Sequence, residues 1–178
     1  MGHFYFVRHG ESVWNIRNKI CGKTDSPLTQ KGHEQAVQTA EEILKQGIRA
    51  DMILCSPLLR AYATAEHISD ICGIPFRTED RLTEQAFGRF EGTARDGEEF
   101  RQAKTRFIDS YGGGETMLKT AHRVYSLLDE ITSQEDTVYI LAAHNGLARI
   151  VESYFRDMTN EEFAAFGLKN CEIRRYDY

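Results

Sequence analysis

Proline, tryptophan and long apolar runs are all scarce in this sequence. Its 178 residues include three prolines and one tryptophan, and 41% of them are hydrophobic. No apolar run approaches the roughly 18 residues that a membrane-spanning helix needs. This composition excludes disordered, collagen-like and membrane-spanning classes and is typical of a globular protein. The length predicts a single domain over residues 1–178.

Cysteine is also scarce and is not arranged for metal binding. The four cysteines form no C-x-x-C pair, and no histidine pair follows at zinc-finger spacing. We therefore expect reduced thiols, no metal site and no cofactor. The N-terminal residues lack the basic segment and apolar run of a signal peptide, so we expect a cytoplasmic protein.

Positive charge is in the minority. The chain has 22 Lys and Arg against 27 Asp and Glu, a formal net charge of −5. This balance argues against nucleic acid or an anionic membrane as a partner. Net charge does not exclude a small basic pocket, and we expect a small phosphorylated substrate. The expected assembly is a monomer or a homodimer.

Strand-like apolar runs alternate with helical patterns, which predicts an α/β fold. The predicted strands cover residues 4–7, 52–55, 75–78, 137–143 and 172–176. The predicted helices follow Thr29, Ser56-Pro57, residue 97, residue 116, His144 and the capping box at Thr159. Ser56 is predicted as an N-cap with Pro57 at the first helical position. Helical periodicity predicts that Leu44, Ile71 and Leu118 lie on the inward-facing apolar sides of their helices, together with the other apolar residues at helical spacing.

Two histidines share one context in the sequence. His9 directly follows the first predicted strand, and His144 directly follows the strand at residues 137–143. Ligands of parallel α/β sheets bind at the carboxyl ends of the strands. We therefore expect the two imidazoles to converge at that edge, where the backbone N–H groups that open the helix after His144 attract anions.

Two arginines strengthen the case for an anion site. Arg60 lies in the first turn of a predicted helix, where a cation opposes the helix dipole and a bound anion would offset that cost. Arg8 adjoins His9. Two guanidinium groups with two imidazoles favour a phosphate over a carboxylate as the ligand.

Motifs across nearly the whole chain resemble those of the histidine phosphatase superfamily, whose fold is phosphoglycerate-mutase-like. Arg8 to Ser12 with Asn15 fits its R-H-G-x-S/T-x-x-N motif. The other matching segments are Asp25 to Thr29 with Gly32, Gln35 and Ala36; Ser56 to Leu58 with Arg60, Ala61, Thr64 and Ala65; and Leu82 and Glu84 with Gly88, Glu91 and Gly92. The resemblance implies a three-layer α/β/α sandwich with a mostly parallel central sheet, and it is strongest to the short bacterial phosphatases.

The resemblance also implies roles for individual residues. His9 would be the nucleophile, and Arg8, Arg60 and His144 would hold the phosphate. Glu84 would be the general acid for the leaving oxygen and then the base for water. Asn15, Cys21, Gly22 and Asn145 complete the expected substrate-binding set. The family commonly has Gly where this chain has Asn145, and we expect that side chain to contact the phosphate or narrow the mouth.

The resemblance predicts a metal-independent phosphomonoester hydrolase that forms a phosphohistidine. A cofactor-dependent phosphoglycerate mutase is the alternative within the family. Such mutases are longer, with a Tyr where this chain has Phe87, a Lys where it has Arg95, and an Arg-Arg pair that it lacks before Gly114. The Arg174-Arg175 pair is expected at a strand edge. These differences favour the phosphatase.

Two hypotheses from other functional classes stay open. A metal-dependent phosphohydrolase would need several hard ligands at defined spacing, and the sequence has no H-E-x-x-H or D-x-D motif. A non-catalytic phospholigand-binding module would keep the arginines but would not need His9 or Glu84. Residues 93–113 are expected to form a lid-like segment that sets specificity, and its cations favour a substrate with a second anionic group.

Overall fold

A computed structural model describes residues 2–178 and contains one five-stranded sheet in the order β3-β2-β4-β1-β5. The strands are β1 (His3–Arg8), β2 (Met52–Cys55), β3 (Phe76–Thr78), β4 (Tyr139–Ala143) and β5 (Ile173–Asp177). Neighbouring strands from β3 to β1 pair in parallel, and β5 pairs antiparallel to β1. The predicted mostly parallel sheet is confirmed.

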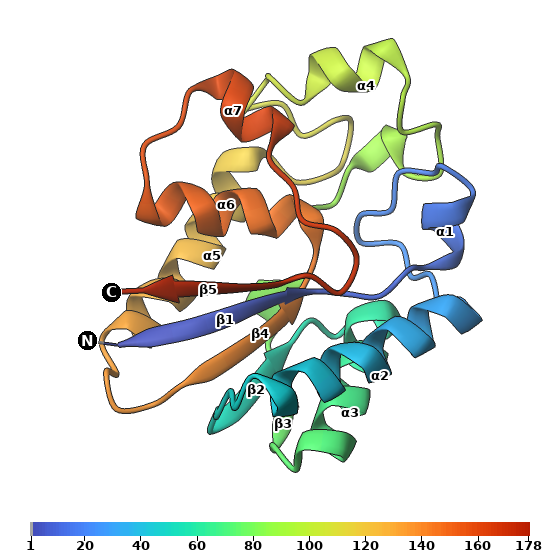
Figure 1. Ribbon diagram of the computed structural model, residues 1–178. Helices are drawn as coiled ribbons and strands as arrows, with labels where there is room; N and C mark the ends of the chain where they lie inside the picture. Colours follow the sequence, from blue (N-terminus) through green and yellow to red (C-terminus); the bar gives the residue numbers. More distant parts are fainter. Residues whose placement is uncertain (1) are drawn as a thin grey trace.

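Helices cover both faces of the sheet (Figure 1). One face carries α2 (Gln30–Lys45) and α3 (Leu59–Cys72), and the other carries α5 (Met117–Thr132) and α6 (Asn145–Phe155). The shorter helices are α1 (Val13–Ile16), α4 (Glu98–Ala103) and α7 (Asn160–Ala165), with 3₁₀ turns at Asp80–Leu82 and Gly88–Phe90. The α/β/α sandwich that the sequence predicted is therefore the observed architecture.

The central strand β1 shows how the sequence builds two cores. Successive side chains of a strand point to opposite faces. Phe4 and Phe6 accordingly pack with α5 and α6, whereas Tyr5 and Val7 pack with α2 and α3. All four are buried, which explains why β1 is a continuous apolar run rather than an alternating one.

Several local predictions about helices were wrong. Helix α3 has Leu58 as its N-cap, not Ser56, and Pro57 lies before the helix. The side chains of Leu44, Ile71 and Leu118 are exposed, because each lies at the margin of an apolar face whose centre is already filled. The helix predicted over residues 98–108 ends at Ala103, and Ile108 is exposed.

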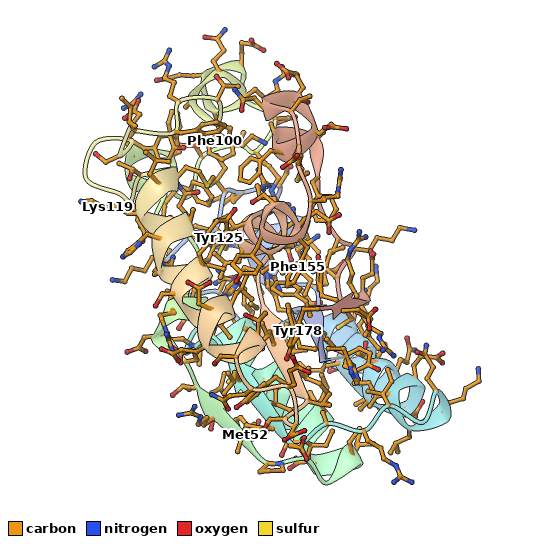
Figure 2. The ribbon with its side chains drawn as sticks, turned by 90° about the vertical axis from the view of Figure 1, so that its left-hand side faces the viewer. Met52, Phe100, Lys119, Tyr125, Phe155 and Tyr178 are labelled. Carbon is orange, nitrogen blue, oxygen red and sulfur yellow. The ribbon has the colours of Figure 1, made fainter. Side chains whose placement is uncertain are left out.

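A third apolar cluster holds the segment that the sequence predicted as a lid. Ile20, Phe90, Phe100, Ala103 and Tyr111 are buried against one another. Figure 2 shows Phe100 at the end of the molecule opposite Met52, beyond the layer formed by α5 and α6. Phe100, Ala103 and Tyr111 of residues 93–113 are therefore packed in this third cluster, whereas Phe107 packs against the core beneath α5 and α6.

Candidate active site

The carboxyl ends of β1 and β4 bring the two predicted histidines together. The strands are adjacent, with Arg8 in register with Ala143. His9 directly follows β1 and His144 directly follows β4, and their ring centroids are 5.2 Å apart. The sequence-based expectation that these imidazoles converge is confirmed.

The ring of His9 has a defined tautomer. Its Nδ1 lies 2.7 Å from the carbonyl oxygen of Gly10. A carbonyl oxygen can only accept, so Nδ1 carries the proton and Nε2 keeps its lone pair. The backbone N–H of His9 donates to the carbonyl of Ala143 at 2.9 Å, which ties the turn after β1 to β4.

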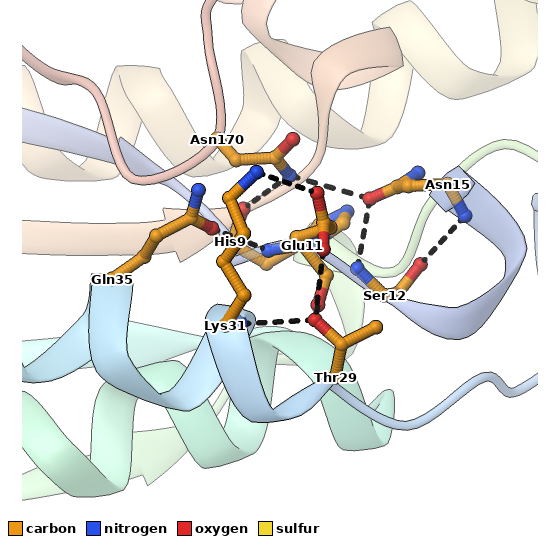
Figure 3. Close-up of polar contacts among 9 residues, drawn as sticks. His9, Glu11, Ser12, Asn15, Thr29, Lys31, Gln35 and Asn170 are labelled. Carbon is orange, nitrogen blue, oxygen red and sulfur yellow. Dashed lines mark hydrogen bonds and ion pairs between the residues drawn. The ribbon is translucent and has the colours of Figure 1, made fainter.

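A polar network holds the turn that follows His9 (Figure 3). Asn170 Nδ2 donates to the carbonyl of His9 at 2.9 Å and to Asn15 Oδ1 at 3.3 Å. Asn15 Oδ1 also accepts from the backbone N–H of Ser12, as part of a reciprocal capping box. The sequence analysis missed Asn170, because it is separated from His9 by 161 residues and no local pattern marks it.

Arg60 is a buried cation that no carboxylate neutralises within residues 2–178. Only 1% of its surface is exposed. Its two terminal nitrogens donate to the carbonyls of Gly22 and Thr24, at 2.8 and 3.2 Å, and its Nε has no partner. Gly22 thus supports Arg60 through its carbonyl and does not itself line the pocket.

The loop that holds Arg60 is anchored in turn by Glu91. The carboxylate of Glu91 accepts from the backbone N–H groups of Lys23, Thr24 and Phe87 at 2.8–3.1 Å. A Cβ at Gly22 would lie 2.3 Å from the carbonyl oxygen of Gln85, so the close packing here requires glycine. The sequence analysis quoted Glu91 as part of a motif but assigned it no role.

Arg8 reaches the same site from the end of β1. Its guanidinium donates to the carbonyl of Leu168. Burial, and then the positive charge of Arg95, lowers the pKa of Arg8 to about 10. Arg8 is therefore still positively charged at neutral pH, and a bound anion would stabilise that charged form.

His144 is completely buried against His9. Its Nε2 lies 2.7 Å from Ser56 Oγ, and its Nδ1 has no partner among the described residues. Ser56 is therefore placed to orient this imidazole. The unpaired ring nitrogen, Nδ1, lies in a site that also contains Arg8 and Arg60. A buried polar atom without a partner is costly unless a ligand satisfies it.

Glu84 lies at the first turn of α6 and lines the same pocket as His9. Its carboxylate accepts from the backbone N–H of Gly146 at 3.0 Å and from that of Gln85 at 2.9 Å. A Cβ at Gly146 would lie 2.3 Å from Glu84 Oε1. The carboxylate can occupy this position only because residue 146 has no side chain, a requirement that the sequence analysis did not identify.

One pocket opens at this edge of the sheet, with about 740 Å³ of empty space including its mouth. The predicted site residues that line it are Arg8, His9, Asn15, Cys21, Glu84 and Asn145. Arg60 and His144 are buried and outside this lining. The lining also includes Arg149, which the sequence analysis missed.

Asn145 makes a contact that the sequence did not predict. Its Oδ1 accepts from the backbone N–H of Leu168 at 2.8 Å, and the carbonyl of Leu168 accepts from Arg8. The side chain also lines the pocket. The residue that replaces the family's usual glycine is thus a link between the start of α6, the loop at residues 167–168 and Arg8.

Both histidines have pKa values well below the usual 6.5. Burial lowers the pKa of His9 most, followed by the charges of Arg60 and Arg8. Burial also lowers the pKa of His144, followed by Arg60 and then His9. Both rings are therefore neutral at physiological pH, and the lone pair of His9 Nε2 remains available.

These shifts predict how stability depends on pH. Below the unfolded-state pKa of 6.5, the unfolded chain binds protons that the folded protein does not. Stability from these rings is therefore complete above that pH and is lost as the pH falls, by up to about 1.4 kcal/mol per pH unit for each histidine. Urea unfolding between about pH 5 and 7, without phosphate, measures this slope.

The matched variants are His144→Gln and His122→Gln. His144→Gln should reduce the slope by up to about 1.4 kcal/mol per pH unit, because it removes one of the two shifted groups. His122 is exposed on α5, so His122→Gln should leave the slope close to that of the wild type. An unchanged slope in His144→Gln would show that this ring is not held neutral.

Residues 2–178 also lack two features that would point to other functions. No group of three or more His, Cys, Asp and Glu side chains in this part of the chain is placed to hold a metal ion. None of its helices combines the length and apolar character needed to cross a membrane.

Comparisons with known proteins agree with this geometry. Residues 4–178 match the family described as the histidine phosphatase superfamily (branch 1). A protein of Yersinia pestis (strain Pestoides F) named "Probable phosphoglycerate mutase GpmB" is 31% identical over 182 residues, covering 98% of this chain and 84% of the relative.

Solved structures show the same fold. The mycobacterial glucosyl-3-phosphoglycerate phosphatase in complex with VO3 matches with a TM-score of 0.84 and 26% identity, over 98% of this chain and 90% of that one. The α-ribazole phosphatase of Shigella flexneri matches at 22% identity with a TM-score of 0.83, over 98% and 90% of the two chains. With the family matched from β1 to the last residue, the chain belongs to the histidine phosphatase superfamily.

Proposed function

We propose that the protein is a metal-independent phosphomonoester hydrolase that acts on a small phosphorylated metabolite through a phosphohistidine intermediate. One observation carries the proposal. The Nδ1 proton of His9 is held by the Gly10 carbonyl, so a neutral Nε2 is available beside Arg8 in a pocket that also contains Glu84.

The charges around His9 suit a phosphate group. Arg8 and Arg60 have no ion-pair partner within residues 2–178, and each retains a buried Nε without a hydrogen bond. Preorganised cations stabilise the charge that develops on the equatorial oxygens during phosphoryl transfer. The unpaired Nδ1 of His144 can donate a further hydrogen bond when it carries the ring proton.

The proposed reaction has two steps. In the first, the lone pair of His9 Nε2 attacks phosphorus, the bond to the ester oxygen breaks, and protonated Glu84 gives its proton to the leaving oxygen. In the second, Glu84 takes a proton from water as the water oxygen attacks phosphorus. The N–P bond then breaks, which releases inorganic phosphate and restores both His9 and the acid form of Glu84.

The mutase alternative rests on the name of the Yersinia relative. Against it stands the position of the paired arginines at the end of this chain. Both arginines lie on β5. Arg174 forms an ion pair with the buried Glu152, and Arg175 forms one with Asp177. Neither lines the pocket. A phosphatase is also named among the solved relatives, with complexes of VO3 and of inorganic phosphate.

The direct test measures p-nitrophenyl phosphate hydrolysis in the presence of EDTA. Full activity is expected, because no step uses a metal ion. Rapid quenching should trap a phosphoenzyme that is acid-labile and base-stable, as a phosphohistidine is. Loss of activity on chelation would overturn the proposal. A parallel assay of 3- to 2-phosphoglycerate conversion distinguishes the mutase, for which isomerisation would exceed phosphate release.

Asn145→Gly is expected to raise KM by about two- to tenfold, the equivalent of one hydrogen bond, with a smaller change in kcat. The reason is that the variant releases the Leu168 N–H and loosens the carbonyl that orients Arg8. Asn160→Gly is the matched control, since Asn160 is the first residue of α7 as Asn145 is of α6. An unchanged KM in Asn145→Gly would show that this link does not position Arg8.

A further inference from the structure

The cations of residues 93–113 divide into two groups. Arg101 forms an ion pair with Glu98 and Arg106 forms one with Asp109, and both arginines are exposed on the outer side of the segment. Arg95 and Lys104 instead line the pocket, half-buried, and form no ion pair within residues 2–178. The sequence alone could not separate these groups.

A third unpaired cation lines the same pocket. Arg149 lies one turn along α6 from Asn145 and Gly146, so it projects from the same helix face into the pocket. Its Nε is buried without a hydrogen-bond partner. Glu84 raises the pKa of Arg149 but is too far away for an ion pair, and burial lowers that pKa more strongly.

These three side chains are close enough to affect one another. Burial lowers the pKa of Lys104, and the charges of Arg149, Arg95 and Arg101 lower it further. Arg95 is also among the charges that lower the pKa values of Arg8 and His9. Outside the active site, the unpaired cations Lys23, Arg49 and Arg77 are exposed to water.

Hydrogen bonds and apolar packing hold the segment that carries Arg95 and Lys104. Arg95 donates to the carbonyl of Lys19 at 3.1 Å, and its backbone N–H donates to that of Asn18. The ammonium of Lys104 lies 5.2 Å from the ring centroid of Phe100, which belongs to the apolar cluster beneath α4. Part-buried positive charges held together without counterions are stabilised by a bound anion.

We propose that Arg95, Lys104 and Arg149 form a subsite for a second anionic group of the substrate. The substrate class is then a small phosphate monoester that also carries a carboxylate or a second phosphate. This rests on the proposed function, which places the ester phosphate at His9 in the same pocket. Both groups would belong to one molecule, because His9 and the three cations line the same pocket.

Equilibrium binding tests the subsite without requiring turnover. The probes are propylphosphonate, 3-phosphonopropionate and propane-1,3-bisphosphonate, measured by calorimetry. The wild-type protein should bind at least one of the doubly anionic probes about 10- to 100-fold more tightly than propylphosphonate, the range for a charge-assisted hydrogen bond. The two doubly anionic probes show whether a carboxylate or a phosphate is preferred.

Variants identify the residues responsible. The preference for the second anion should fall about tenfold or more in Lys104→Met and in Arg149→Met. Arg101→Met and Arg106→Met, in the same segment but paired on its outer side, should retain it. Propylphosphonate binding reports whether each variant still folds, and Arg149→Lys should restore part of the preference.

Two outcomes would overturn the subsite. One is the absence of any preference in the wild type, and the other is a preference that persists in folded Lys104→Met and Arg149→Met. Neither depends on the hydrolase activity. A protein that binds the doubly anionic probe but never releases phosphate from an ester would refute the proposed function and leave the subsite intact.

Discussion

His9→Ala is expected to lower kcat/KM for phosphate monoesters by at least about four orders of magnitude. The substitution removes the only group whose lone pair is set to attack phosphorus, while the cations that bind the ester remain. KM should change little, because the groups proposed to bind the phosphate, on Arg8, Arg60 and His144, are all retained. The measurement is steady-state hydrolysis of p-nitrophenyl phosphate together with quench trapping of the phosphoenzyme, which should disappear.

The control for this variant is His122→Ala, which removes an exposed imidazole from α5 and should leave both readouts unchanged. Rescue of His9→Ala by added imidazole would further support His9 as the nucleophile, because imidazole supplies the missing group to an intact pocket. Residual turnover near the wild-type rate, or a labelled phosphoenzyme in His9→Ala, would require a different nucleophile.

The convergence of His9 and His144 was predictable because it depends on a rule of topology. Both residues end a buried strand, and parallel strands end at the same edge of the sheet. Arg60 was predictable for a related reason, since a cation in the first turn of a helix implies a compensating anion. Neither inference required the details of side-chain packing.

Ser56 shows where local rules fail. Its position before Pro57 matches a helix start, yet the helix begins after Leu58 and Ser56 Oγ lies 2.7 Å from His144. Ser56 Oγ still accepts from the backbone N–H of Leu58 at 3.3 Å, so the capping signal marks the turn before the helix rather than its first residue. No pattern near Ser56 discloses a partner that lies 88 residues away.

Arg149 and Asn170 were missed for the same physical reason. Each lies far along the chain from the groups it faces, and each meets them only through the packing of α6 and of the final loop on β1. The division of the cations in residues 93–113 also depends on how α4 is turned. The sequence could locate the candidate phosphate site but not the further cation Arg149 that lines its pocket.

Gly146→Ala is expected to lower the hydrolysis of alkyl phosphates by about 10²- to 10⁴-fold, the usual contribution of a general acid. Its Cβ would lie 2.3 Å from Glu84 Oε1, so the carboxyl group must move away from the leaving oxygen. Helix stability should not suffer, because alanine replaces glycine within α6. The first step with p-nitrophenyl phosphate, measured as the burst of p-nitrophenolate, should slow much less, since p-nitrophenolate leaves without a proton.

Glu84→Ala should show the same dependence on the leaving group, and the double variant separates positioning from damage. If Gly146 acts through Glu84, adding Gly146→Ala to Glu84→Ala should cost little more than Glu84→Ala alone. Additive losses would mean that the glycine serves another part of the pocket. Equal losses in the first step for alkyl and p-nitrophenyl esters in Glu84→Ala would contradict a role for Glu84 as the acid, because in that step only a poor leaving group needs the proton that Glu84 supplies.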